Sequence, residues 1–241
     1  MPRLTLTNGG AEALKWLALL LMVGDHVNKY LFNGTLPVLF EAGRICAPLF
    51  ALVFAWNLAR PGVAARAHVV ALRLVVVGLV ASVPFIALGK LMAGWYPLNI
   101  LFALACIAGL VALDHLADEL AQQGRRKARD GVFLASAVVF IVGGGLVEFW
   151  WPLVGLGLAA YSYFSRPSIW SAGIAALCLA GLCFINQNLW AVLSVVLVVT
   201  VGRWSLRVPR AKWFFYAFYP LHLVGLWLIR IPMAKAGYLF F

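Results

Sequence analysis

Charged residues are scarce in this sequence. They make up 11% of the 241 residues, whereas 64% are hydrophobic and the mean hydropathy is +0.96. Soluble domains carry roughly 25% charged residues, so this composition excludes an ordinary soluble protein. It predicts an all-α fold, a polytopic transmembrane helical bundle. Because no stretch between the apolar runs is long enough to fold alone, residues 1–241 are expected to form a single domain.

The sequence also lacks paired cysteines, a cleavable leader and an internal repeat. Its four cysteines, Cys46, Cys106, Cys178 and Cys183, fall in apolar runs without C-x-x-C spacing, so we expect packing roles and no metal. No small-residue cleavage pattern follows the first apolar run, which is therefore expected to remain in the mature protein. The missing repeat gives no support to the inverted-repeat design of many transporters.

Apolar runs of about 20 residues, the length that crosses a bilayer, recur along the whole chain. Two of the runs are short, so eight or ten spans are compatible with the pattern as well as nine. The longest polar interval, residues 117–130, is expected to be a basic cytoplasmic loop. The nine predicted spans are 12–32, 36–58, 67–89, 97–116, 131–149, 151–165, 168–185, 189–202 and 213–231.

Basic residues outnumber acidic ones, 19 to 8, giving a net charge of +11. In a soluble protein this excess would suggest nucleic acid as a partner. In a membrane protein, Lys and Arg accumulate in cytoplasmic loops. With the amino terminus inside, the nine spans place 14 basic residues on the cytoplasmic side and 4 on the outer side. The charge therefore predicts a cytoplasmic amino terminus in a lipid bilayer and no nucleic-acid partner.

Ionisable residues in the first apolar run mark a candidate site. Asp25, His26 and Lys29 lie there, and a charge at the centre of a bilayer helix costs about 2.5 to 3.5 kcal/mol. Glu41 and Arg44, early in the next span, fall at the same depth. Consecutive residues lie about 100° apart around a helix, so we expect Asp25 to bind Arg44 while His26 faces a cavity. Pairing within each helix, at i,i+4 or i,i+3, is the alternative.

Other spans bring polar residues to the same outer layer: Asn99, Glu148, Tyr219 and His222. A structural reading exists for each of them. A membrane histidine such as His222 often only donates an interhelical hydrogen bond, and Tyr219 precedes Pro220, where a helix kinks because proline has no N–H.

A second cluster of basic residues is predicted at the cytoplasmic ends of the second, third, eighth and ninth spans. The preference of basic residues for the cytoplasmic side explains each of them singly. As a group they also suit a phosphorylated cytosolic ligand, since guanidinium groups match phosphate oxygens. The cluster consists of Arg60, Arg66, Arg73, Arg203, Arg207, Arg210 and Lys212.

Several motifs, taken in order, resemble the TraX family over nearly the whole chain. They are Leu14-Lys15-Trp16, Met22-Val23-Gly24-Asp25-His26, Gly43-Arg44-Ile45-Cys46-Ala47-Pro48-Leu49-Phe50, Asn99-Ile100-Leu101-Phe102 and Tyr219-Pro220-Leu221-His222-Leu223. The resemblance implies a multi-pass acetyltransferase of the bacterial inner membrane that uses acetyl-CoA, in a family named for acetylating the amino terminus of a conjugative pilin. It also implies that Asp25 and His26 form the active site, with Arg44, Asn99 and His222 as companions. Asn28 stands where the family has a small residue, which leaves the acceptor open.

The resulting hypothesis is acetyl transfer with His26 as general base, suited by an unperturbed imidazole pKa near 6.5. Arg44 or Asn99 would stabilise the tetrahedral oxyanion. Coenzyme A would enter from the cytoplasm, with its phosphates on the basic cluster, and the acceptor would be a protein amino terminus or a carbohydrate on the periplasmic side. The main alternative is a proton-coupled transporter with Asp25, His26 and His222 as a relay. A noncatalytic membrane scaffold is a third possibility, and it leaves the outer charges unexplained.

Overall fold

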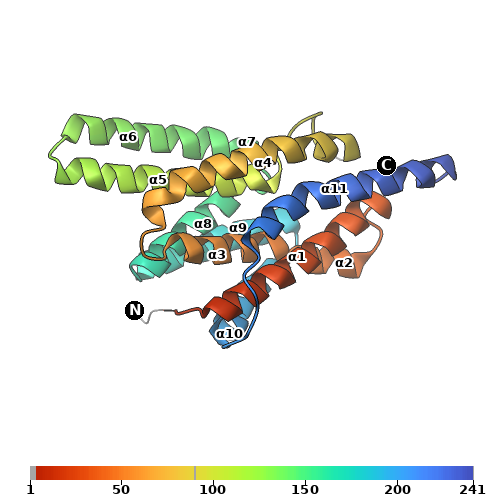
Figure 1. The fold of residues 1–241 in the computed structure, drawn as a ribbon, viewed down its shortest axis with the longest axis horizontal. Coiled ribbons are helices and arrows are strands. Elements are labelled where there is room, and N and C mark those ends of the chain that lie inside the picture. Colours follow the sequence, from red (N-terminus) through yellow and green to blue (C-terminus); the bar gives the residue numbers. More distant parts are fainter. Residues whose placement is uncertain (1–3, 90, 241) are drawn as a thin grey trace.

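Long helices running nearly along one direction form the fold in a computed structural model, which describes residues 4–89 and 91–240 (Figure 1). Arg3 and Lys90, both included in the charge count above, lie outside the described residues, as does the side chain of Lys212. The α-helices are α1 (Asn8–Leu31), α2 (Pro37–Gly43), α3 (Cys46–Leu58), α4 (Ala67–Leu88), α5 (Ile100–Gln122), α6 (Arg126–Val138), α7 (Gly144–Leu146), α8 (Trp150–Ser165), α9 (Ile169–Asn186), α10 (Leu193–Thr200) and α11 (Lys212–Lys235).

Shorter helical turns extend four of these helices. Three are 3₁₀ segments: η1 (Ala64–Arg66) leads into α4, and η3 (Trp190–Val192) and η4 (Val201–Arg203) flank α10. The fourth, η2 (Val139–Gly143), is a π-helical turn that joins α6 to α7. Side-chain caps fix three helix starts: Thr7 accepts from the Gly10 N–H, Asn99 from the Leu101 N–H and Ser168 from the Ser171 N–H.

Six helices of the described chain are long and apolar enough to cross a membrane, which supports a helical membrane bundle. The other three predicted spans fall on segments of a different kind. α1 has 24 residues but carries Glu12, Lys15, Asp25 and Lys29, α8 has 16 residues, and residues 190–203 form a shorter apolar helix. The six are residues 37–58, 64–88, 100–122, 126–146, 169–186 and 213–235.

The prediction of a loop at residues 117–130 is wrong. α5 continues to Gln122 and α6 already begins at Arg126, so only a tight turn separates the two helices. The interval is polar but rich in Ala, Arg and Gln, all good helix formers. His115 and Glu119, 3.3 Å apart at i,i+4, also support the extension, and Gly124 supplies the left-handed residue that ends it (φ +71°).

The predicted span 36–58 is two helices, α2 and α3, with Arg44 at the break. The N–H of Arg44 bonds to the Glu41 carbonyl and that of Ile45 to the Ala42 carbonyl, so the chain tightens there to i,i+3 bonds. Pro48 has no N–H with which to continue the helical ladder back to Arg44. The sequence Arg44-Ile45-Cys46-Ala47-Pro48 therefore places an arginine at a local interruption of an otherwise apolar span.

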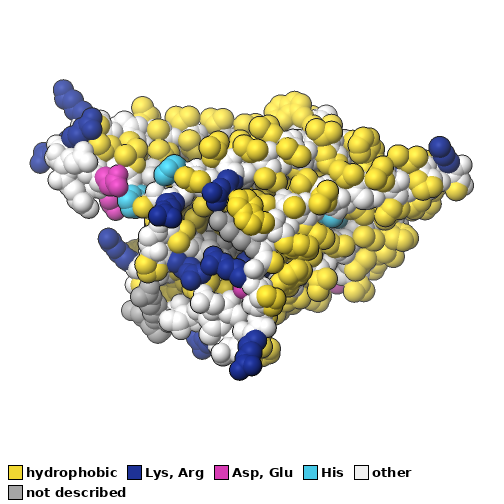
Figure 2. Space-filling view, viewed as in Figure 1, with side chains coloured by type: hydrophobic (Ala, Val, Ile, Leu, Met, Phe, Trp, Pro, Cys, Tyr) yellow, Lys and Arg dark blue, Asp and Glu magenta, His cyan; other side chains and the backbone are white. Residues whose placement is uncertain are grey.

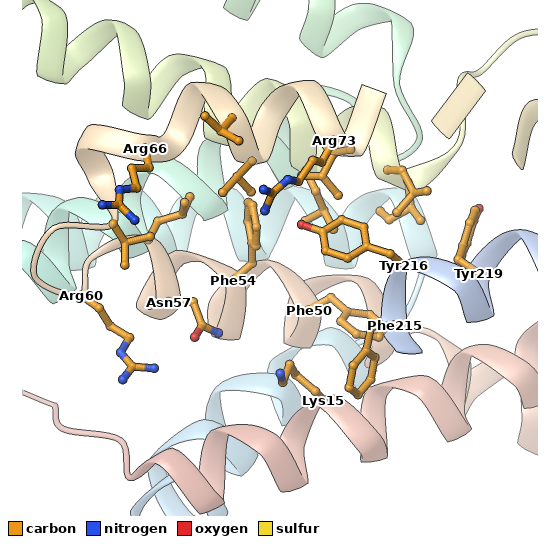
Figure 3. A pocket seen from close by; sticks show the side chains of 18 of the residues that line it. Lys15, Phe50, Phe54, Asn57, Arg60, Arg66, Arg73, Phe215, Tyr216 and Tyr219 are labelled. Carbon is orange, nitrogen blue, oxygen red and sulfur yellow. The ribbon is translucent and has the colours of Figure 1, made fainter. Parts of the chain in front are cut away.

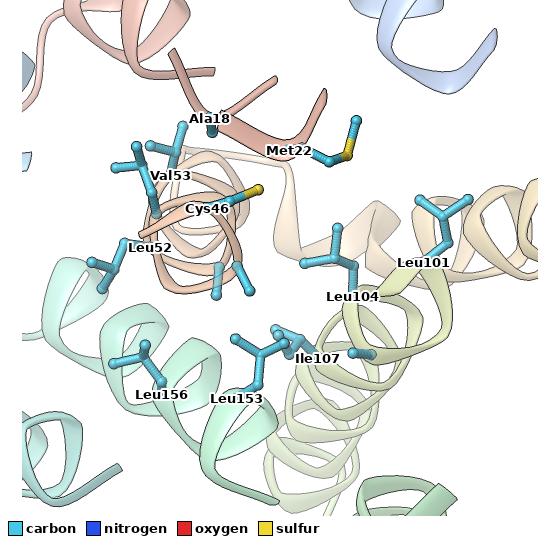
Figure 4. Close-up of a cluster of buried hydrophobic side chains, with 14 of the residues drawn as sticks. Ala18, Met22, Cys46, Leu52, Val53, Leu101, Leu104, Ile107, Leu153 and Leu156 are labelled. Carbon is cyan, nitrogen blue, oxygen red and sulfur yellow. The ribbon is translucent and has the colours of Figure 1, made fainter. Parts of the chain in front are cut away.

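Helices α1, α3, α5 and α8 enclose a cluster of buried hydrophobic side chains (Figure 4). Ala18 and Val53 meet between α1 and α3, while Ile107 of α5 lies against Leu153 of α8. Lipid tails are as apolar as leucine, so close packing rather than the exclusion of water holds such helices together. This packing fixes α1 and α3, which carry several of the predicted site residues.

The start of α1 is fastened to the segment that leads into α11. The Thr7 N–H donates to the Gly202 carbonyl (2.8 Å), and the Thr7 hydroxyl donates to the Trp204 carbonyl (2.6 Å). A Cβ at Gly9 would lie only 1.8 Å from the Leu206 carbonyl oxygen, so only glycine permits this approach. The contact holds residues 204–211, with Arg207 and Arg210, beside the start of α1.

Candidate active site

The ion pair expected between the first two predicted spans is present. A terminal nitrogen of Arg44 lies 2.5 Å from the Asp25 carboxylate, and the two side chains are only 16% and 17% exposed. The Arg44 Nε also donates to the Phe40 carbonyl (3.2 Å), and the guanidinium lies 4.4 Å from the Phe40 ring centroid. A Cβ at Gly43 would meet the Asp25 carboxylate at 2.4 Å, so this glycine makes room for the pair.

The two predicted site histidines meet directly, although 196 residues separate them in the chain. Nδ1 of His26 on α1 lies 2.7 Å from Nε2 of His222 on α11, and the two rings are nearly parallel (4°), with their centroids 5.0 Å apart. The Phe218 ring is also nearly parallel to the His222 ring, with centroids at 5.3 Å. The expected pairing of Asp25 with Arg44 is therefore observed, but His26, which was expected to face a cavity, instead contacts His222.

Hydrogen bonding assigns the tautomers of the neutral histidine pair. Nδ1 of His222 lies 3.1 Å from the Phe218 carbonyl oxygen, which accepts only, so this nitrogen carries a hydrogen. Nε2 of His222 is then an acceptor, and Nδ1 of His26 must be the donor to it. Nε2 of His26 therefore keeps its lone pair, the state that a general base requires.

Asn99 is built into the framework rather than joined to the histidine pair. Its side chain is fully buried at the start of α5, where the amide oxygen accepts from the Leu101 N–H. The amide nitrogen donates to the Gly78 carbonyl (3.0 Å) and to the Ser82 hydroxyl (3.1 Å). Both amide hydrogens are thus bound to α4, and the geometry favours a structural role over oxyanion stabilisation.

A cavity of about 840 Å³ lies between α1, α3, α4, α5 and α11. Phe50 and Phe54 give its middle an apolar lining, whereas cationic side chains gather at the end where α3 leads into α4, which we call the basic end (Figure 3). On one face of the molecule, Lys and Arg side chains surround a hollow (Figure 2). The opposite end of the cavity is lined by Ile100, Leu101, Phe218 and Tyr219.

Four members of the predicted basic cluster line this cavity: Arg60, Arg66, Arg73 and Arg210. Arg207 instead lines a second cavity of about 520 Å³, which shares Arg60 and Arg210 with the first. Arg203, at the end of η4, lines neither cavity. Lys212 belongs to α11, but its side chain lies outside the described residues.

The sequence reasoning missed Lys15 as a lining residue. Its ammonium lies 2.6 Å from the Glu12 carboxylate and 4.9 Å from the Phe215 ring centroid. Glu12 is buried and also approaches Arg210 at 3.9 Å. The signal was available: a Glu and a Lys at i,i+3 in an otherwise apolar helix occupy one face and mark where that helix borders a polar space.

The cavity stops just short of the histidine pair. Met22 lines it one turn before His26 on α1, and Tyr219 lines it one turn before His222 on α11. The Tyr219 ring contacts both imidazoles, with its centroid 6.3 Å from that of His26 and 5.3 Å from that of His222. Tyr219 therefore lies between the cavity and the histidine pair.

Glu148 follows α7, and its backbone N–H donates to the Leu98 carbonyl (3.0 Å) just before α5. Within the part of the chain that the structure describes, no three His, Cys, Asp or Glu side chains are grouped so as to hold a metal ion. The four cysteines are free thiols.

Comparisons with known proteins identify the family that the motifs resemble. The family model described as TraX protein matches residues 10–230. Protein TraX of Escherichia coli is 39% identical over 103 residues, a stretch that covers 42% of this chain and 38% of that protein. The chain thus aligns with well under half of the length of that relative. No solved structure matches. Because the family model extends over almost all of its helices, this multi-pass membrane protein belongs to the TraX family.

Proposed function

We propose that this protein is an acetyl-CoA-dependent acetyltransferase that works across the bacterial inner membrane. Acetyl-CoA would bind from the cytoplasm, and the acceptor would be an amine or hydroxyl on the periplasmic side, either a protein amino terminus such as that of a pilin or a carbohydrate. The observation that carries the proposal is the 840 Å³ cavity, which has arginines at one end and Tyr219 beside the histidine pair at the other.

The chemistry of the cavity suits the parts of acetyl-CoA. Arg60, Arg66 and Arg210 would hold the phosphates at the basic end, because guanidinium groups bind phosphate oxygens in a bidentate manner. The pantetheine arm would lie along the apolar middle, where Phe50 and Leu58 line a stretch of α3 about 12 Å long at 1.5 Å per residue. The volume also falls in the range of roughly 300 to 1,000 Å³ that is usual for ligand pockets.

His26 would act as general base in a direct transfer. The acceptor N–H or O–H proton goes to Nε2 of His26 while the acceptor atom bonds to the thioester carbonyl carbon, and the C=O pair moves onto oxygen. Collapse of the tetrahedral intermediate breaks the C–S bond. The leaving thiolate takes the proton back from the imidazolium, so the products are the acetylated acceptor and coenzyme A. His222 would hold His26 in the required tautomer.

The proposal includes the topology with nine spans and a cytoplasmic amino terminus. In this arrangement α1, α8 and residues 190–203 cross the membrane together with the six longer apolar helices. Arg60 and Arg66 then face the cytoplasm, where acetyl-CoA is available, and the Asp25–Arg44 pair lies in the outer half of the bilayer.

The test uses the purified full chain in lipid nanodiscs with radiolabelled acetyl-CoA. A peptide with a free amino terminus and N-acetylglucosamine serve as acceptors, and free coenzyme A and acetylated product are identified by mass spectrometry. We expect product from the wild type and from His68→Ala, which changes an exposed histidine that lines neither cavity. His26→Ala should still bind coenzyme A but form no product.

Two results would contradict the proposal. The first is full retention of transfer by His26→Ala. The second is intact acetyl-CoA in every reaction together with proton movement across sealed vesicles that depends on His26, which would establish the transporter alternative.

A further inference from the structure

Tyr219 is a polar side chain at the end of the cavity opposite the basic end. It is 4% exposed and lines the cavity, and its ring contacts those of His26 and His222. In the close view of the cavity, its side chain stands at one end of the row of labelled residues, with Arg60 and Arg66 at the other end (Figure 3). A ligand that filled the cavity from the basic end would therefore reach Tyr219 before the histidine pair.

The Tyr219 hydroxyl is buried, and no group of the described chain makes a hydrogen bond to it. The backbone N–H of Ile100 approaches the phenol oxygen from the start of α5 without completing a hydrogen bond, and it leaves the hydroxyl hydrogen free. A buried hydroxyl without a partner costs about 1 to 3 kcal/mol. Such a group at the end of a ligand-sized space is placed to bond to the ligand.

We propose that Tyr219 is the oxyanion donor of this active site, its hydroxyl donating to the thioester carbonyl oxygen of acetyl-CoA bound in the cavity. This inference rests on the acetyltransferase function proposed above. The carbonyl would lie between the Tyr219 hydroxyl and Nε2 of His26, so that the acceptor attacks from the histidine side while charge develops on the oxygen that faces the phenol. A donor that is already in place stabilises that charge without reorganisation.

The residues expected to supply this donor are occupied elsewhere. Both amide hydrogens of Asn99 bond to α4, and Arg44 is bound to the Asp25 carboxylate and the Phe40 carbonyl. Tyr219 has a free donor and a position in the cavity wall. It therefore takes over the role that the sequence had suggested for Arg44 or Asn99.

The chain offers a matched control. Tyr30 is also fully buried, has a hydroxyl without a partner and lies with its ring centroid 5.5 Å from that of His26, but it does not line the cavity. Tyr219→Phe and Tyr30→Phe each remove one unpaired hydroxyl next to the same histidine and keep the ring. Neither change breaks a hydrogen bond within the protein, so both variants should fold.

The first measurement is steady-state transfer in nanodiscs, with coenzyme A release followed by chromatography. We expect Tyr219→Phe to lower kcat about 100-fold or more, the usual effect of losing one oxyanion donor, with KM for acetyl-CoA unchanged within about twofold. Tyr30→Phe should keep kcat within about threefold of the wild type. A structural role for the tyrosine ring would not produce this split, because phenylalanine preserves the ring.

The second measurement needs no acceptor. The infrared band of acetyl-CoA labelled with ¹³C at the thioester carbonyl should lie at lower frequency when bound to the wild type and Tyr30→Phe than when bound to Tyr219→Phe, since a hydrogen bond weakens the C=O bond. Equal bands and equal kcat in the two variants would overturn the assignment of Tyr219. Failure of the wild type to bind acetyl-CoA would instead refute the proposed function.

Discussion

Removing one charge from the Asp25–Arg44 pair should destabilise the protein, and removing both should restore part of the loss. Two unit charges about 4 Å apart interact with about 4 kcal/mol at the effective dielectric constant of 20 that suits protein sites. The pair is 16% and 17% exposed and is further shielded if lipid surrounds the bundle. Breaking a buried ion pair typically costs about 3 to 5 kcal/mol, because the remaining charge keeps its desolvation cost without a partner.

The two single changes are not equivalent. Asp25→Asn leaves the Arg44 guanidinium, which does not lose its proton in proteins, so the full penalty of about 3 to 5 kcal/mol is expected. Arg44→Met leaves a carboxylate that becomes neutral by taking up a proton, and its cost should be smaller, about 1 to 3 kcal/mol. The double variant holds no charge at this place and should be more stable than Asp25→Asn alone.

The assay is reversible unfolding in mixed detergent micelles, followed by circular dichroism for the wild type, the two single variants and the double variant. A double-mutant cycle then isolates the interaction between the two side chains. The decisive comparison is the sign of the effect of Arg44→Met in the Asp25→Asn background, which we expect to be stabilising. If Arg44→Met lowers stability by the same amount in both backgrounds, the two side chains do not interact, and the reasoning fails.

Three further changes test other parts of the site. Gly43→Ala places a Cβ 2.4 Å from the Asp25 carboxylate and should cost about 1 to 3 kcal/mol in the same unfolding assay, so unchanged stability would contradict the close approach. Arg66→Gln should weaken binding of acetyl-CoA about tenfold or more, but should not weaken binding of acetyl-pantetheine, which lacks the phosphates. The control Arg126→Gln, at the exposed start of α6, should affect the binding of neither ligand. Equal effects of Arg66→Gln on both ligands would exclude a phosphate contact. Asn99→Ala should lower stability by about 1 to 2 kcal/mol through loss of a helix cap, and kcat should fall only as far as the fraction of folded protein falls. A loss of kcat at normal stability would instead indicate that Asn99 stabilises the oxyanion.

The sequence predicted most helices well because a helix that crosses lipid needs a run of about 20 apolar residues. Apolar runs of the right length became α4 and α9, within one residue of the predicted ends, and α5 and α11, which continue beyond the predicted carboxyl ends. The predicted loop at 117–130 failed because polarity distinguishes lipid from water but not helix from coil. A helix such as α5 continues beyond the lipid when its polar residues are good helix formers.

The candidate site was predictable where a residue type is costly in lipid. Asp25 and Arg44 had to find each other, since each charge needs a partner at that depth. The direct contact of His26 with His222 was not predictable, because it depends on how α1 and α11 are rotated about their axes. Tyr219 was named in the outer layer but given a structural role, because a tyrosine before a proline can be explained by a helix kink. Its unpaired hydroxyl and its place in the cavity wall are visible only in the structure.

The separation of the histidines along the chain has a consequence for biogenesis. A membrane protein enters the bilayer helix by helix as it is synthesised, so α1 is inserted first. His222 is not synthesised until 196 residues after His26. Arg44 follows Asp25 after 19 residues, which neutralises the early charge almost at once. The contact between His26 and His222 forms only when α11 docks against α1. A chain interrupted before α11 would therefore contain the Asp25–Arg44 pair but lack the histidine contact on which the proposed catalysis depends.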